Sequence, residues 1–242
     1  MRQLYRKEIS TYLDSLIAYV VILVFLTTVG LLIWVFPDTS VLRYGFADLY
    51  TLFSVTPYVF MFLIPAITMR SIAEEAKSGT LELLFTQPLS DFDIVLGKFL
   101  AAWTIAIFAI APTIIYYFSV YLLGSPVGNL DSAGIAGSYI GLVMLAGLFT
   151  SVGVMTSSLT KNQVIAFVLA VFGCFLLFSG FDSLASTEWL KDHSTTIRQF
   201  GVLHHYNALS KGLVDSRNLI YFLSGVSIML MLTKLNLSSR KW

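Results

Sequence analysis

The sequence predicts an all-α integral membrane protein with six transmembrane helices, an N-terminal interfacial helix, a cytoplasmic elbow and a re-entrant external segment. Of its 242 residues, 57% are hydrophobic and only 12% are charged, a balance too apolar for a water-soluble domain of this size. The apolar residues gather in six long runs, each able to cross a hydrocarbon layer about 30 Å thick. We therefore expect residues 1–242 to form one transmembrane domain.

The start of the chain predicts a helix that lies along the membrane surface. A helical wheel of residues 1–14 places Tyr5, Ile9, Tyr12 and Leu13 on one face, with polar side chains opposite. Six spans follow, which we expect at residues 15–36, 50–69, 99–123, 138–159, 163–181 and 219–235.

Two further stretches have a recognisable pattern. The fourth span, 138–159, is rich in glycine, alanine and serine, which predicts close packing against neighbouring helices. The polar stretch 182–218 is too long for a simple turn and is amphipathic, so we expect short helices that dip toward the membrane.

Residues 70–98 form the sizeable polar stretch between the second and third spans. A helix continuing out of the membrane should end near Gly79, because glycine tolerates the left-handed conformation that stops a helix. A short second helix fits residues 80–85, and the Thr80 hydroxyl is expected to accept a bond from the free amides at its start.

The second half of this stretch ends the short helix and starts another. Pro88 forbids continuation because it lacks an N–H, and Ser90 with Asp93 has the spacing of a capping box. The predicted order is a helix, a break, a short helix, a second break and a third helix, and this arrangement forms a rigid elbow. Two interpretations remain open at this point: a docking site for another protein, or a solvated connector.

The Lys and Arg residues fall unequally on the two sides of the expected spans. One side carries Arg2, Arg6, Lys7, Arg70, Lys77, Lys98, Lys161, Lys234, Arg240 and Lys241; the other carries Arg43, Lys191, Arg198, Lys211 and Arg217. Because cytoplasmic loops are enriched in these residues, we expect both termini and the elbow to be cytoplasmic.

The predicted spans lack ionisable side chains at membrane depth. The spans carry no Asp, Glu, Lys, Arg or His away from their ends, which argues against an ion-coupled carrier and against an intramembrane enzyme. No phosphate-binding loop of the G-x-x-x-x-G-K-[ST] type occurs, so any ATP energy must come from a partner. We expect no catalytic residue and no cofactor in this chain.

The residues that could bind metal do not form a ligand set. His204 and His205 are adjacent and point in different directions on a helix, and Cys174 is the single cysteine, within an apolar run. We expect no metal site and no disulfide. The formal net charge of +1 gives no case for a nucleic-acid partner.

The elbow carries a specific motif. Glu75, the run 79–84 (Gly-Thr-Leu-Glu-Leu-Leu), the run 88–90 (Pro-Leu-Ser) and the run 96–98 (Leu-Gly-Lys) together resemble the cytoplasmic loop of type 2 ABC transporter permeases. Six spans, an interfacial first helix and a re-entrant external segment are also similar to that family, so the resemblance covers essentially the whole chain.

The resemblance implies a permease in a bacterial inner membrane that pairs with a second permease half, as a homodimer or heterodimer. It also implies that cytoplasmic ABC ATPase subunits drive the permease and that the elbow is the coupling element. Carried over by position, the residues that contact the ATPase or shape the coupling loop are Glu75, Gly79, Thr80, Glu82, Leu83 and Leu84. Because the elbow is predicted to face the cytoplasm, Leu83 and Leu84 are also expected to be an exposed apolar pair.

Within the family, residues 62–70 resemble the gliding-motility-associated permeases of the GldF type. The resemblance therefore implies a subunit that couples ATP hydrolysis to transport or to gliding motility. An alternative stays open, namely a scaffold that transports nothing and anchors an ATPase in a motility complex.

Overall fold

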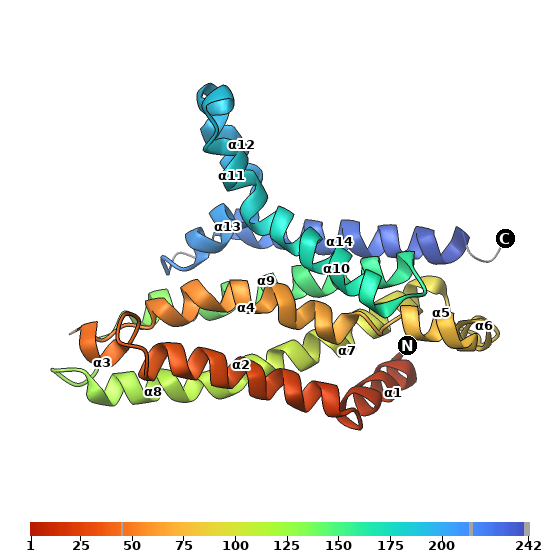
Figure 1. The fold of residues 1–242 in the computed structure, drawn as a ribbon, viewed down its shortest axis with the longest axis horizontal. Helices are drawn as coiled ribbons and strands as arrows, with labels where there is room; N and C mark the ends of the chain where they lie inside the picture. Colours follow the sequence, from red (N-terminus) through yellow and green to blue (C-terminus); the bar gives the residue numbers. More distant parts are fainter. Residues whose placement is uncertain (45, 213–214, 240–242) are drawn as a thin grey trace.

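Six apolar helices run along the bundle in the computed structural model, which describes residues 1–44, 46–212 and 215–239 (Figure 1). They span Leu16–Trp34, Tyr50–Ser78, Asp91–Leu123, Ser132–Leu159, Gln163–Ala185 and Ser216–Ser239. This confirms the predicted all-helical architecture with six spans. Arg240 and Lys241, which entered the orientation argument, lie outside the described residues.

The bounds of the individual helices locate the breaks. In the first half they are α1 (Arg2–Leu13), α2 (Leu16–Trp34), α3 (Val41–Tyr44), α4 (Tyr50–Thr68), α5 (Ala73–Ser78), α6 (Thr80–Phe85), α7 (Asp91–Ile110) and α8 (Ile114–Leu123). In the second half they are α9 (Ser132–Leu159), α10 (Gln163–Phe175), α11 (Phe181–Ala185), α12 (Ser194–Phe200), α13 (Val202–Leu209) and α14 (Ser216–Ser239). A π-helical turn, Leu176–Gly180, joins α10 to α11.

The α9 helix is the central element, and its small residues allow its neighbours to approach, as the sequence predicts. A Cβ added at Gly153 would overlap the Thr68 hydroxyl of α4, and one at Gly137 would overlap the Leu209 carbonyl of α13. Close backbone approach of this kind maximises van der Waals contact where no hydrophobic drive operates between helices in lipid.

The segment between α10 and α14 leaves the bundle and returns to it. The α11 and α12 helices project sideways from the bundle, and α13 packs back against α9 (Figure 1). Tyr206 of α13 is buried there, and its hydroxyl donates to the Phe53 carbonyl of α4 at 2.7 Å.

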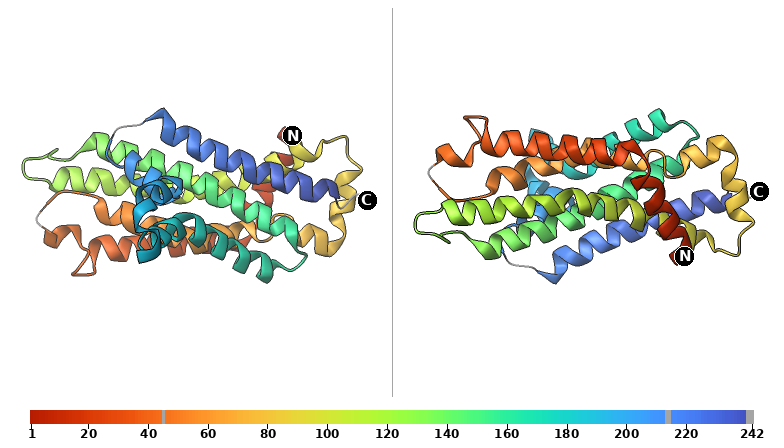
Figure 2. Two further views of the ribbon diagram at one scale, coloured as in Figure 1. Left: turned by 90° about the horizontal axis from the view of Figure 1, so that it is seen from above. Right: turned by 90° about the horizontal axis from the view of Figure 1, so that it is seen from below.

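The elbow and α1 share one end of the bundle with the last turn of α14 (Figures 1 and 2). There the Ser238 hydroxyl donates to Asp91 at the start of α7 (3.0 Å), and the Asn236 amide donates to the Ser158 carbonyl of α9 (2.6 Å). The end of the chain therefore braces the helices from which the elbow emerges.

Candidate functional site

The break between α4 and α5 is held by Ser157, a side chain of α9. Its hydroxyl donates to the Met69 carbonyl at 3.0 Å and accepts from the amides of Ile72 and Ala73, each at 3.0 Å. In an uninterrupted helix the Ala73 amide would bond to the Met69 carbonyl, so the hydroxyl is inserted between them. The expected helix therefore does not run straight into the elbow but turns at residues 69–72.

The turn between α5 and α6 is built on Gly79, which has the predicted left-handed conformation with φ of 74°. The expectation that Thr80 caps α6 is wrong. Gly79 occupies the cap position, so Thr80 is already the first helical residue, and its hydroxyl is hydrogen-bonded to the Ser78 hydroxyl at 2.9 Å. The side chains of Ser78 and Thr80 thus fasten α6 to the end of α5.

The α6 helix turns two leucines inward and one outward. Leu81 and Leu84 are buried in an apolar cluster with Ile94 and Val95 of α7, whereas Leu83 is 67% exposed. The expectation of an exposed Leu83–Leu84 pair is therefore wrong for Leu84, which is 7% exposed because the three-residue step from Leu81 returns it to the same helical face. Glu82 and Thr80 are exposed beside Leu83.

The α7 helix begins with the predicted capping box. The Ser90 hydroxyl accepts from the Asp93 amide at 3.1 Å, and the Asp93 carboxylate accepts from the Ser90 amide at 3.3 Å. Because both bonds satisfy groups that a helix start leaves free, they fix where the elbow ends.

A group of four charges lies where α1, α5 and α7 meet, and we call it the charge cluster: Lys7, Glu8, Glu75 and Lys98. Lys98 is 1% exposed, and its Nζ lies 3.1 Å from Glu8 Oε1 and 2.9 Å from Glu75 Oε2. Lys7 Nζ lies 3.3 Å from both Glu8 Oε1 and Glu75 Oε1. Two positive and two negative groups balance, which is the condition for burying charges without an unpaired one.

The electrostatic setting keeps Lys7 protonated. Partial burial acts to lower the pKa of Lys7, but the adjacent carboxylates of Glu8 and Glu75 outweigh that effect and raise the pKa above its ordinary value. A cavity of about 180 Å³ beside these groups is lined by polar side chains of α1 and of the elbow. The joint between α1 and the elbow is therefore polar and ionic.

The charge cluster lies on the buried side of α1. Leu4 and Glu8 are the buried residues of this helix, and Tyr5 and Tyr12 of the face that the sequence predicts are half-buried beside them. Leu4 packs on Gly97, where an added Cβ would lie 3.1 Å from Leu4 Cδ2, and Glu8 one turn later reaches Lys98. Figure 2 shows α1 crossing the start of α7.

Four residues of this site were not among the site residues expected from the sequence: Lys7, Glu8, Lys98 and Ser157. The last three have a weak signal in the sequence. Glu8 lies four residues after Leu4, on the same helical face, and Lys98 follows a glycine within a helix. Ser157 belongs to the small-residue pattern that predicts close packing, and nothing in that pattern distinguishes a hydroxyl that bonds to another helix.

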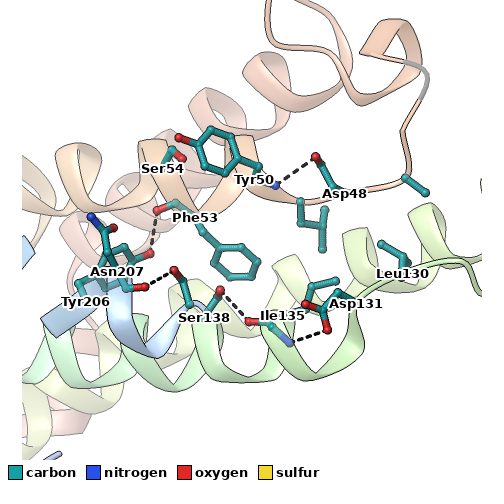
Figure 3. A pocket seen from close by; sticks show the side chains of 14 residues that line it. Asp48, Tyr50, Phe53, Ser54, Leu130, Asp131, Ile135, Ser138, Tyr206 and Asn207 are labelled. Carbon is teal, nitrogen blue, oxygen red and sulfur yellow. Dashed lines mark hydrogen bonds between the residues drawn. The ribbon is translucent and has the colours of Figure 1, made fainter. Parts of the chain in front are cut away.

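A second cavity, of about 320 Å³, lies at the opposite end of the bundle between α4, α9 and α13 (Figure 3). Asp48 accepts from the Tyr50 amide at 3.2 Å, and Asp131 accepts from the Gly134 amide at 3.0 Å. Both carboxylates thus hold helix starts.

His205 of α13 has structural partners. His205 lies 2.9 Å from the Gln199 carbonyl and 2.8 Å from the Asn218 side-chain oxygen, and its ring stacks on Tyr221 at 3.9 Å. Among the described residues, no three His, Cys, Asp or Glu side chains are grouped so that they could hold a metal ion.

Comparison with known families agrees with this geometry. A family model described as ABC-2 family transporter protein matches residues 3–237. No curated protein matches the chain. The matched residues include α1, the elbow and the whole charge cluster.

Proposed function

Because the chain belongs to the ABC-2 family of transporter proteins, as the multi-pass permease component of an ABC transporter, we propose that a separate cytoplasmic ATPase drives it through the elbow. Family membership implies association with such an ATPase and with membrane lipid. Leu83 is the observation that carries the proposal. It is 67% exposed on a short helix whose other leucines are buried, outside the apolar run of the spans. A large apolar side chain so placed is stabilised by burial against a partner.

The energy source is the first point to test. The sequence has no phosphate-binding loop, so the purified chain alone should hydrolyse no ATP, whereas its complex with the ATPase should. ATP hydrolysis by this polypeptide free of any partner would contradict the proposal. A preparation of the partner ATPase alone provides the baseline.

The proposed orientation places both termini and the elbow in the cytoplasm of a bacterial cell, with the chain in the inner membrane. The Lys and Arg asymmetry supports it. A membrane-impermeant thiol reagent should label Trp189→Cys in intact cells and Lys77→Cys only after permeabilisation. Both positions are exposed, and the native Cys174 is buried, so it provides no background. The reverse labelling pattern would overturn the orientation.

Two roles are compatible with an ATPase-driven permease, namely transport of a solute and a part in motility, and a test for a transported solute distinguishes them. Family membership supports transport with a second permease half, identical or different, whereas the resemblance of residues 62–70 to gliding-motility-associated permeases of the GldF type supports motility. ATP-dependent movement of a solute across vesicles containing the purified complex would establish transport. A complex that hydrolyses ATP and moves no solute would favour the scaffold alternative.

A further inference from the structure

We propose that the ion pair between Glu75 and Lys98 is the positioning contact that makes α1 and α7 move with α5. The inference rests on the proposed function, because it concerns how movement of the elbow enters the membrane domain. In this proposal the ATPase binds α6, and the charge cluster transmits a displacement of α5 to α1 and α7.

The α1 helix is firmly attached to α7. Leu4 packs on Gly97, the Tyr5 hydroxyl lies 3.0 Å from the Thr104 hydroxyl, and Glu8 pairs with Lys98 at 3.1 Å. An apolar contact, a hydrogen bond and an ion pair within little more than one turn of α1 leave it little freedom to move apart from α7.

The ionic contact of α5 with this unit is made by one carboxylate, beside the apolar packing of Leu81 and Leu84 of α6 on α7. Glu75 is the residue of α5 in the charge cluster, and its two oxygens reach different partners, Lys98 at 2.9 Å and Lys7 at 3.3 Å. A displacement of α5 that separated Glu75 from Lys98 would leave a 1% exposed ammonium with Glu8 as its remaining acidic partner in the cluster. Because stranding a buried charge is costly, α5 is expected to carry α1 and α7 with it.

The α1 helix is joined to the first span by a very short link. It ends at Leu13, and α2 begins at Leu16 after two residues, Asp14 and Ser15; the Ser15 side chain accepts from the Ile17 amide. A shift of α1 is therefore passed to the first span. A displacement of α5 then reaches α4 through the main chain, α7 through Lys98 in addition to the packing of α6, and α2 through α1.

The test separates positioning from folding by means of two variants. Glu75→Gln removes one charge and leaves the cluster with two lysines and one acid. The double variant Glu75→Gln with Lys98→Gln removes the pair and leaves Lys7 and Glu8 balanced, so its thermal stability should recover relative to the single variant. Glu74→Gln is the matched control, because Glu74 is an exposed neighbour 4.0 Å from Arg70 and outside the cluster.

The readout is ATP turnover by the ATPase in the complex relative to the ATPase alone. Both cluster variants should retain the ATPase through α6 but lose stimulated turnover by roughly fivefold or more, the size of a typical coupling between sites. Glu74→Gln should behave as the unmodified chain. Wild-type turnover in the double variant would show that the cluster only stabilises the fold and would overturn the inference. Failure of the unmodified chain to retain or stimulate the ATPase would instead contradict the proposed function.

A distance measurement addresses the movement itself. Spin labels at Gln3→Cys and Lys77→Cys, both exposed positions, report the separation of α1 from α5. In the complex this separation should be the same with and without bound ATP. In Glu75→Gln the distribution of distances between the two labels should broaden. A separation that changes with ATP in the unmodified cluster, or one that Glu75→Gln leaves unaltered, would overturn the inference.

Discussion

The hydroxyl of Ser157 donates to the carbonyl of Met69, the residue at which α4 gives way to the turn before α5. The same oxygen accepts from two amides beyond the break, so one side chain of α9 replaces the helical bond that the turn interrupts. The direction of the elbow is thus set by α9, whereas the span that leads into the elbow is α4.

Replacing this hydroxyl should destabilise the protein. Ser157→Ala leaves the amides of Ile72 and Ala73, both fully buried residues, without that acceptor, at a cost of roughly 1 to 3 kcal/mol. Ser151→Ala is the control, because Ser151 is equally buried on α9 but bonds only within its own helix, to the Leu148 carbonyl. Its cost should be smaller, because no backbone group of another helix loses a partner. Unfolding in detergent compares the two, and equal costs would contradict the assigned role of Ser157.

Leu83 and Leu84 should separate binding from folding. Because Leu83 is exposed, Leu83→Ala should change unfolding by less than about 0.5 kcal/mol but weaken ATPase association by about 1.5 to 3 kcal/mol, roughly tenfold or more. Leu84→Ala opens a cavity in the cluster with Ile94 and should cost about 2 to 5 kcal/mol of stability. Thermal unfolding and ATPase affinity are measured on the same preparations. A Leu83→Ala protein that loses stability and keeps its affinity would count against docking at α6.

Gly79 should tolerate only residues that accept its backbone conformation. No atom lies within 4 Å of an added Cβ there, so the effect of substitution comes from the positive φ and not from a clash. Gly79→Val should disfavour the turn by about 1 to 2 kcal/mol and misdirect α6, which lowers ATPase affinity. Gly79→Asn is the matched control, since asparagine is the other residue found at such positions. Equal affinity of the two variants would argue against the turn as the feature that directs α6.

Gly153 should be sensitive for the opposite reason. An added Cβ would overlap the hydroxyl of Thr68, a fully buried side chain, so Gly153→Ala should cost about 1 to 3 kcal/mol of stability. At Gly180 an added Cβ would meet only ordinary contacts with Leu176 at 3.5 Å or more, and Gly180→Ala should be close to neutral by comparison. Equal melting temperatures for the two variants would show that α4 and α9 are not packed as closely as described.

Much of the fold follows from local sequence features. The six spans arise from the length and apolarity of their runs. The α6 helix begins directly after Gly79 and ends at Phe85, shortly before Pro88, as expected from backbone chemistry. The capping box at Ser90 was likewise recognisable, because its two partners are three residues apart.

The interactions that hold the elbow were not recognisable in the same way. Lys98 and Glu8 are 90 residues apart, and Ser157 is 85 residues from Ile72, so no local pattern pairs them. No local pattern predicts a buried Glu8, since a carboxylate is buried only where a distant lysine compensates its charge. The exposure of Leu84 was misjudged because α7 folds back beneath α6, which is a tertiary arrangement.

Photo-crosslinking tests most directly whether the ATPase binds the outward face of α6, as proposed. A photo-crosslinking amino acid is incorporated at Leu83 and, as a control, at Trp189, which is 98% exposed between α11 and α12. Irradiation of the complex in membranes should join position 83 to the ATPase and should leave position 189 without an ATPase adduct. A complex in which the ATPase co-purifies but position 83 forms no adduct with it, or in which position 189 does, would contradict this account.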